Sequence, residues 1–147
     1  MIEHSVIHGW NEARKYVRNH GGYTRFKSNL FKQMFKNGPY PCEFMVMHDG
    51  PTLLGMMTYC FKASVPEYGL TDIWFIGDFD TTRGTKGMAT KMMEWFLQNK
   101  GNRFYIGCWD NVAEKFWMHM AVKLNLSVSK IGTTKFDTPI LQFGPLP

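Results

Sequence analysis

Apolar residues recur along the chain at helical and at strand spacings, in an order that covers almost the whole sequence. Residues 1–7 are a weak strand candidate, and residues 10–20 carry an apolar face at intervals of three and four positions. Gly21 ends that helix, and Thr24 is placed to cap a second helix that extends to Lys36. The first part of the chain is therefore expected to hold one strand and two helices.

The middle of the chain has the short apolar runs and turn signals that are typical of strands. Asp49 and Gly50 form a turn signal between two such runs, which predicts a hairpin. Gly77 interrupts the next apolar run at a place typical of a β-bulge. The expected elements are strands at 42–48 and 53–61, a loop at 62–69 and a strand at 70–79.

The C-terminal half returns to helical spacing and then to strands. Asp110 or Asn111 is placed to cap the second helix of this half, and Asn111 with Glu114 resembles a capping box. The predicted elements are a helix at 87–99, a strand at 103–109, a helix up to about 124, and strands at 126–131 and 139–143.

The resulting order is β-α-α-β-β-β-α-β-α-β-β. A strand, helix, strand succession predicts that the strands at 70–79 and 103–109 pair in parallel, whereas the preceding meander predicts antiparallel pairs. We therefore expect an α/β fold with a mixed central sheet and helices on both faces, as a single domain over residues 1–147.

Composition limits the class of protein. No run of about 20 apolar residues is present, and the N-terminus lacks a basic segment followed by an apolar one, so we expect neither a membrane span nor a signal peptide. The three cysteines are far apart, which predicts reduced core thiols in a cytoplasmic protein. Without Cys-x-x-Cys or paired His spacing, no metal site is expected.

The net charge of +5 attracts polyanions such as coenzyme A or nucleic acid.

The segment 78–89 carries the candidate chemistry, because a strand runs into a glycine-bearing loop that opens directly into a helix. Free backbone N–H groups at a helix N-terminus bind phosphate, assisted by the helix dipole. Gly84, Gly87 and Ala89 supply small positions, and Arg83 and Lys86 supply positive charge. The spacing excludes both a Walker loop and a dinucleotide fingerprint.

This loop resembles the pyrophosphate motif of the GNAT superfamily of acyl-CoA N-acyltransferases, Arg/Gln-x-x-Gly-x-Gly/Ala. Gly87-Met88-Ala89 matches the end of the motif, whereas Arg83-Gly84 resembles the usual Arg-Gly with one residue inserted before Gly87. On the next helix, Asn111, an alanine and Trp117 fill the stretch in which the family has Asn, Ala and an aromatic residue. Many members have a tyrosine at the Trp117 position, acting as acid toward the leaving thiolate, and an indole cannot replace it in that role.

The resemblance implies that acetyl-CoA is the co-substrate and that an amine attacks its thioester directly in a ternary complex. It also implies that the two central parallel strands separate, so that backbone groups near Ile76 and Phe79 pair with the pantetheine arm. The N-terminal helices would shape the acceptor site. The residues expected to bind acetyl-CoA are Ile76, Phe79, Arg83, Gly84, Thr85, Lys86, Gly87, Met88, Ala89, Asn111 and Trp117.

Removing a proton from the amine requires a base, and Asp78 and Asp80 lie at the carboxyl end of the central strand, where such folds place ligands. Tyr105 is the candidate acid. Tyr59 is a second candidate acid, Asp72 and Glu43 are weaker candidate bases, and His119 is expected to be exposed. The acceptor and the oligomeric state stay open, with a homodimer among the options.

Two other functions are compatible with the sequence. The chain could be a GNAT-like binding or structural protein without catalysis, for instance in a virus particle, which would fail to bind coenzyme A if the loop is degenerate. It could also be a basic nucleic-acid-binding module, although no RRM, zinc-finger or helix-turn-helix signature is present.

Overall fold

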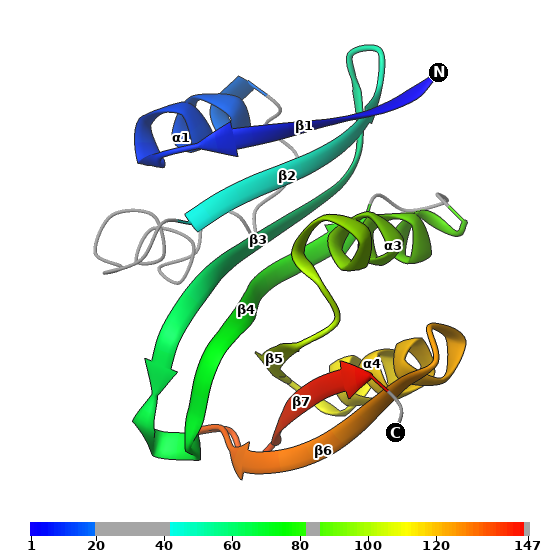
Figure 1. Cartoon of the computed structure of the whole chain (residues 1–147). Helices are drawn as coiled ribbons and strands as arrows, with labels where there is room; N and C mark the ends of the chain where they lie inside the picture. The colour runs from blue at the N-terminus through cyan, green and yellow to red at the C-terminus, as the bar shows by residue number, and fades with distance from the viewer. Residues whose placement is uncertain (20–41, 82–85, 146–147) are drawn as a thin grey trace. The chain divides into compact units, whose positions relative to one another are not determined.

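The computed structural model describes residues 1–19, 42–81 and 86–145, and its elements follow the expected order (Figure 1). The expected helix at 24–36 lies outside the described residues. The elements are β1 (Ile2–His8), α1 (Trp10–Asn19), β2 (Cys42–Asp49), β3 (Thr52–Val65), the 3-10 helix η2 (Pro66–Tyr68), β4 (Leu70–Thr81), α3 (Met88–Lys100), β5 (Phe104–Gly107), α4 (Asn111–Lys123), β6 (Leu126–Thr133) and β7 (Pro139–Pro145).

The described strands form one seven-stranded sheet with the order β1-β2-β3-β4-β5-β7-β6. Strands β4 and β5 pair in parallel, through Trp74 with Phe104 and Phe75 with Tyr105. Strand β1 pairs antiparallel with β2, as do β2 with β3, β5 with β7 and β6 with β7. The predicted mixed sheet and its central parallel pair are confirmed.

The chain divides into two compact units, and three elements pass from one to the other. Unit 1 comprises Met1–Phe61 and Ile76–Met92, and unit 2 comprises Lys62–Phe75 and Met93–Pro147. Strands β3 and β4 and helix α3 therefore contribute residues to both units. That residues 1–147 behave as a single domain stays a prediction.

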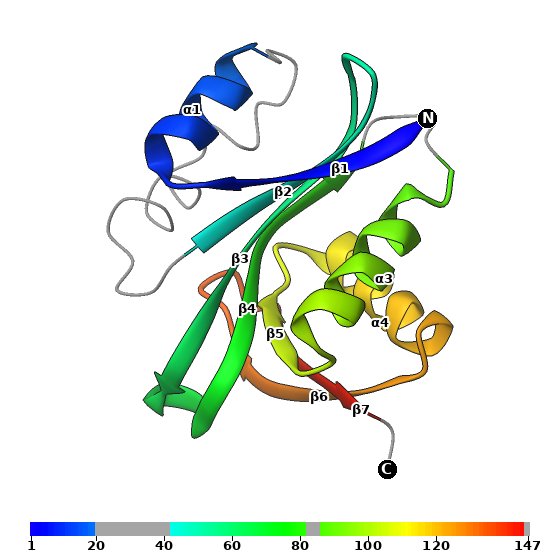
Figure 2. The ribbon, with the colours of Figure 1, turned by 45° about the horizontal axis from the view of Figure 1, so that its top comes forward.

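Helices cover both faces of the sheet in unit 1. On one face, Ala13 of α1 is fully buried in a cluster with Phe44, Val46 and Met56, and Tyr16 of α1 packs edge-on against Phe44. Figure 2 shows α1 beside the strands of this unit. In a helix, the apolar positions of residues 10–20 lie on one face, and these contacts bury that face against the sheet.

The opposite face of unit 1 receives the first turns of α3. Gly55 pairs with Met47 across the hairpin, and a Cβ atom at Gly55 would lie 2.5 Å from Sδ of Met92 and 3.3 Å from Cγ of Met88. Glycine is thus required for the close approach of helix and strand. The contact fixes the N-terminal end of α3 against β3.

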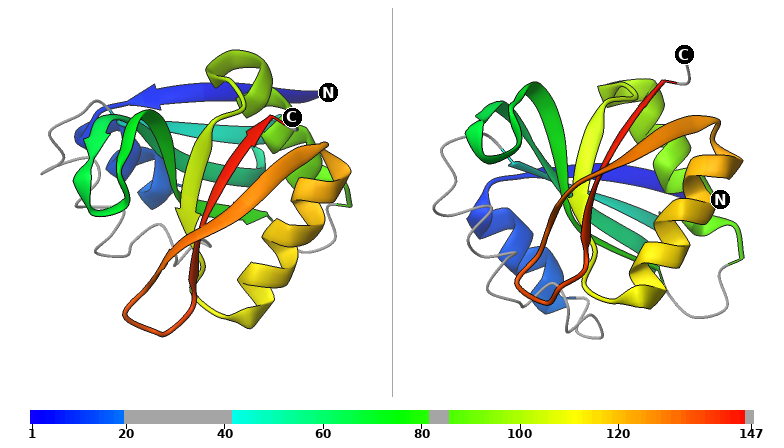
Figure 3. Two further views of the ribbon diagram at one scale, coloured as in Figure 1. Left: turned by 60° about the horizontal axis from the view of Figure 1, so that its bottom comes forward. Right: turned by 90° about the horizontal axis from the view of Figure 1, so that it is seen from below.

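Aromatic packing dominates unit 2 and accounts for much of the aromatic content of the chain. The rings of Phe104 and Phe143 stack with centroids 4.7 Å apart, and Trp117 lies 6.3 Å from Phe104 and 5.9 Å from Phe143. Figure 3 shows the β6–β7 hairpin and α4 in this unit. Such rings bury large apolar areas, and edge-to-face and stacked pairs contribute additional stability.

Strand β3 is longer than the sequence predicts, and the loop expected at 62–69 is wrong. The strand continues to Val65, whose side chain is 4% exposed and packs in a cluster with Leu70 and Ile73. Only η2 and Gly69 make the turn, with Gly69 in the left-handed conformation at φ 66°. The buried partners of Val65 are distant in sequence or across the turn, so local spacing did not reveal the extension.

The cap of α4 also corrects one expectation. Asp110 is the N-cap residue, in extended conformation, and its Oδ1 accepts a hydrogen bond of 2.8 Å from the N–H of Ala113. Asn111 is already the first helical residue, so the capping box of Asn111 with Glu114 is wrong. The residue three positions after the true cap is Ala113, which has no side-chain group to reciprocate.

We expect Asp110→Ala to lower the free energy of unfolding by about 1 kcal/mol, because one helix N–H then loses its acceptor. Asn111→Ala is the matched control and should change it by less than about 0.5 kcal/mol. Urea denaturation followed by circular dichroism measures both values. Equal losses in the two variants would contradict the assignment of the cap.

Candidate functional site

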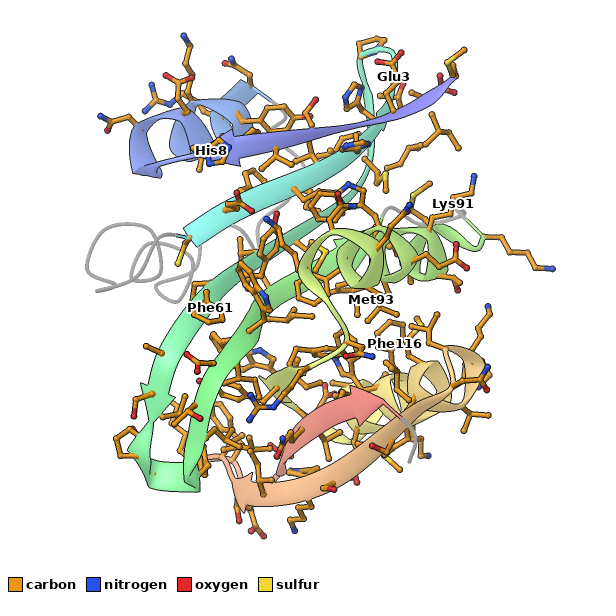
Figure 4. The ribbon with its side chains drawn as sticks, viewed as in Figure 1. Glu3, His8, Phe61, Lys91, Met93 and Phe116 are labelled. Carbon is orange, nitrogen blue, oxygen red and sulfur yellow. The ribbon has the colours of Figure 1, made fainter. Side chains whose placement is uncertain are left out.

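The N-terminus of α3 is the best candidate for binding an anion. Gly87 has φ +80°, no heavy atom lies within 4 Å of the position of its missing Cβ, and its carbonyl oxygen accepts from the N–H of Lys91 at 3.2 Å. Lys86 and Gly87 are exposed, whereas Met88 is buried. Figure 4 labels Lys91 at this end of the helix.

The first turn of α3 contains no acidic residue that would compete with an incoming anion. The first N–H groups of a helix have no intrahelical acceptor, and the helix dipole adds positive potential there. Arg83, Gly84 and Thr85, which the sequence also assigns to this loop, lie outside the described residues.

Asp78 is fixed at the carboxyl-terminal part of β4 by Thr58 of β3. The Asp78 N–H donates to Oγ1 of Thr58 at 2.8 Å, and the Thr58 hydroxyl donates to Oδ2 of Asp78 at 3.3 Å. Thr58 pairs with Phe44 across the β2–β3 hairpin, and Phe44 packs against α1. The Asp78 carboxylate therefore lies on the face of the strands that α1 covers.

Asp80 has a different, local arrangement. Its Oδ1 accepts a hydrogen bond of 3.0 Å from the N–H of Thr81, the next residue in the chain. An aspartate that bonds to its own neighbouring backbone is typical of turns and strand ends. Of the two predicted bases, Asp78 is the one held by a neighbouring strand.

Glu43 stands in a row of three side chains on adjacent strands. Its cross-strand partners are His8 on β1 and Tyr59 on β3, and its Oε2 lies 3.6 Å from Nδ1 of His8. Burial raises the pKa of the Tyr59 hydroxyl, and a hydrogen bond to Glu43 and the charge of that carboxylate raise it further. Tyr59 is fully buried, so this row provides a largely buried carboxylate beside His8 but not an accessible acid (Figure 4 labels His8).

The predicted residues of unit 2 occupy several environments. Tyr105 is 5% exposed and contacts the rings of Tyr68 and Phe75. Trp117 is 6% exposed within the aromatic core, whereas Asn111 and His119 are exposed, the latter as predicted.

Asp72, a weaker candidate base, lies near the start of β4 with φ 50°, and its carbonyl oxygen accepts from Nη1 of Arg103. It thus lies within β4 at the end of the strand opposite to Asp78 along the sequence.

The three cysteines form no disulfide in the structure, with Cys60 and Cys108 buried and Cys42 half-buried, and their reduced state stays a prediction. Burial, and then the charges of Glu114 and Asp110, raise the pKa of the Cys108 thiol to about 11. A thiol with such a pKa stays protonated near neutral pH and is a poor nucleophile. Cys108 therefore does not favour an acyl-enzyme intermediate. Among the described residues, no group of three His, Cys, Asp or Glu side chains is arranged to hold a metal ion.

Solved structures with the same arrangement of elements identify the fold. An acetyltransferase from Thermus thermophilus superposes with a TM-score of 0.62 at 13% identity, covering 99% of this chain and 97% of that one. A GNAT-family acetyltransferase from Bacillus cereus ATCC 10987 gives 0.60 at 12% identity, covering 100% and 99%. The chain has the GNAT fold.

Other structures with this fold include a mutant of the AtaT toxin bound to the C-terminus of the antitoxin AtaR and acetyl-CoA. It superposes with a TM-score of 0.53 at 14% identity and covers 95% of this chain and 92% of that one. No family model and no curated protein matches the sequence. The fold resemblance expected from residues 76–117 is confirmed, although identities of this size show the fold alone.

In this GNAT fold, the predicted residues fall into two groups. Unit 1 holds Asp78, Asp80 and the described acetyl-CoA candidates Ile76, Phe79 and Lys86 to Ala89, whereas unit 2 holds Tyr105, Asn111 and Trp117. The Asp78 carboxylate and the N-terminus of α3 thus belong to the same compact unit. The described part of the chain contains no helix long and apolar enough to cross a membrane.

Two structural features were missed in the sequence. Thr58 is a polar residue within a strand whose neighbours are buried and apolar, and that contrast is the signal that could have found it. Trp109 and Phe136 are 55% and 52% exposed, with ring centroids 5.6 Å apart at the end of β5. No local pattern could show this second pair, because its two residues are distant in the sequence.

Proposed function

We propose that the chain is a divergent GNAT acyltransferase that transfers an acetyl group from acetyl-CoA to an amine. The observation that carries the proposal is the exposed, glycine-opened N-terminus of α3, with Lys86 beside it and no acidic residue in its first turn. A diphosphate placed there would accept hydrogen bonds from backbone N–H groups in the field of the helix dipole.

The proposed binding residues follow from this placement. The N–H groups of Met88 and Ala89 would donate to the diphosphate, and Lys86 and Arg83 would add positive charge. Gly84 and Thr85 would complete the loop. Backbone groups near Ile76 and Phe79 on β4 would pair with the pantetheine arm, and Asn111 and Trp117 of α4 complete the proposed set.

The proposed reaction is a direct transfer. Asp78 takes a proton from the acceptor ammonium, and the neutral amine nitrogen then attacks the thioester carbonyl. An N–C bond forms, the C–S bond breaks, and the leaving thiolate takes a proton from Tyr105, the proposed acid. The second proton, which the nitrogen loses as the amide forms, replaces the one that Tyr105 has given up. The raised pKa of the Cys108 thiol supports direct attack rather than transfer through that cysteine.

Isothermal titration calorimetry with acetyl-CoA, followed by a thiol-release assay over a panel of primary amines, tests this function. We expect saturable one-to-one binding, and release of one free thiol per acetylated amine. A chain that binds neither acetyl-CoA nor coenzyme A would contradict the proposal. A cytoplasmic location and a homodimer stay predictions that these measurements do not address.

A second candidate is a GNAT-like binding protein without catalysis. The observation in its favour is Trp117, whose ring is buried against the rings of Phe104 and Phe143 at the position where many family members have a tyrosine acid. A core indole has no acidic proton to donate. Binding of acetyl-CoA without thiol release from any amine would select this candidate. The basic nucleic-acid-binding module stays an alternative that these measurements do not address.

A further inference from the structure

Thr58 is a buried polar side chain in an otherwise apolar part of β3. Its side chain is fully buried, and so are its neighbours Met57 and Tyr59, while Cys60 is 6% exposed. Removing a hydroxyl from water costs free energy unless hydrogen bonds replace those to water. A valine has the same shape and would avoid that cost. The presence of threonine therefore indicates that the hydroxyl makes hydrogen bonds that matter here.

The hydroxyl bonds twice to one residue, Asp78. Oγ1 accepts from the Asp78 N–H at 2.8 Å and donates to Oδ2 of the same residue at 3.3 Å. A threonine hydroxyl has a single proton. The oxygen accepts the backbone N–H, and because an ionised carboxylate can only accept, the hydroxyl proton is the one that bonds Oδ2. One side chain therefore fixes both the backbone and the side-chain orientation of Asp78.

The neighbouring acidic residue provides a contrast within the same strand. The Asp80 carboxylate accepts from the N–H of Thr81, a contact that depends only on local conformation. Asp78, in comparison, depends on a partner from another strand, and Thr58 in turn is held opposite Phe44 in the core beneath α1. The carboxylate is thus tied to the buried core of unit 1.

We propose that Thr58 is a positioning residue for Asp78, and that it holds the carboxylate ionised and oriented to accept the proton of the acceptor amine. The inference rests on the proposed acetyl transfer. A hydrogen bond donated to the charged form of a carboxylate favours that form over the neutral acid. Catalytic groups must also be held in a productive geometry by the residues behind them. Thr58 itself contacts no substrate.

Thr58→Val tests the proposal, because it keeps the shape of the side chain and removes the hydroxyl. We expect kcat to fall about tenfold, the KM for acetyl-CoA to stay unchanged, and the acidic limb of the pH profile to move up by about one pH unit. The limb moves up because the ionised carboxylate loses a donor. Thr58→Ser restores the hydroxyl and should return both kcat and the limb close to wild type.

Thr52→Val is the matched control, since Thr52 is exposed on the same strand. It should leave kcat and the pH profile unchanged. Circular dichroism of every variant shows whether the fold is retained. If Thr58→Val and Thr58→Ser behave alike, or if the limb does not move, a positioning role is wrong even though acetyl transfer by the wild type stands.

A second measurement separates failure of this inference from failure of the proposed function. Carboxyl 13C NMR follows the titration of Asp78 directly, with the signal assigned by its loss in Asp78→Asn. We expect the Asp78 titration to move up in Thr58→Val and not in Thr52→Val. If the wild type releases no thiol from any amine, the proposed function and the catalytic role of Thr58 both fall. An unmoved titration in an active enzyme overturns the inference alone.

Discussion

Gly87→Glu is expected to abolish acetyl-CoA binding while the fold is retained. The new carboxylate would stand at the first turn of α3, where no acidic residue now lies and where the diphosphate is proposed to bind. Two like charges in contact disfavour binding strongly, and the diphosphate would also lose access to the N–H groups. We expect the affinity measured by calorimetry to fall more than a hundredfold, roughly 3 kcal/mol.

Backbone strain at residue 87 needs its own control, because Gly87 has a positive φ. Gly50 at the β2–β3 turn also has a positive φ, +56°, and no heavy atom lies within 4 Å of its missing Cβ. Gly50→Glu therefore introduces the same residue with comparable strain, away from α3. It should bind acetyl-CoA like the wild type. Equal loss of binding in both variants would attribute the effect to strain.

Ala89→Glu removes the question of strain, since Ala89 is already helical in the first turn of α3. A glutamate there interacts favourably with the helix dipole, so the helix should be no less stable. We nevertheless expect acetyl-CoA binding to be lost, because the charge again meets the diphosphate. Unchanged calorimetric binding in Ala89→Glu would refute the proposed anion site.

Strong periodicity is the part of the fold that the sequence predicted well. In α3, the side chains expected on the apolar face include Met88, Met92, Met93 and Phe96, and all four are buried. The physical reason is that a helix of this length has one face toward the core, so burial repeats with the helical period. The strand, helix, strand order likewise determined the parallel pair of β4 and β5.

Boundaries were less predictable, because tertiary contacts decided them. Val65 extends β3 through contacts with Leu70 and Ile73, and those contacts exist only after the chain has turned. The cap of α4 fell one residue earlier than the Asn111 and Glu114 spacing suggested, because Asp110 adopted the extended conformation that a cap requires. When two adjacent residues are similarly good N-caps, their residue types alone do not show which of them caps the helix.

The candidate site was predictable in part. The helix opening at Gly87 follows from a local motif, so the sequence placed it correctly next to Lys86. The bond between Thr58 and Asp78 depends on how β3 and β4 are aligned, which no local pattern contains. For the same reason the sequence treated Asp78 and Asp80 as equivalent, whereas the structure gives them different partners.

The different partners of Asp78 and Asp80 lead to the second prediction with a large expected effect. Asp78→Asn is expected to lower kcat about a hundredfold, a loss within the range typical of removing a general base. The asparagine has nearly the same shape, and its carbonyl oxygen can still accept from the Thr58 hydroxyl, so the strand and its register should be preserved. The affinity for acetyl-CoA should stay within about twofold, because the proposed diphosphate site lies at α3 and does not use this carboxylate.

Asp80→Asn is the matched control two residues further along β4. Its carboxylate is engaged with the N–H of Thr81, and an amide oxygen can keep that bond, so kcat should change by less than about threefold. Steady-state kinetics on the best amine of the panel, with acetyl-CoA saturating, gives both values. If Asp80→Asn shows the larger loss of kcat, the base is Asp80, whose carboxylate bonds only to the next residue. A hydrogen bond from a neighbouring strand then does not mark the catalytic carboxylate. If neither variant loses activity, another group or solvent removes the proton from the amine. The row of His8, Glu43 and Tyr59 should then be tested next by substitution.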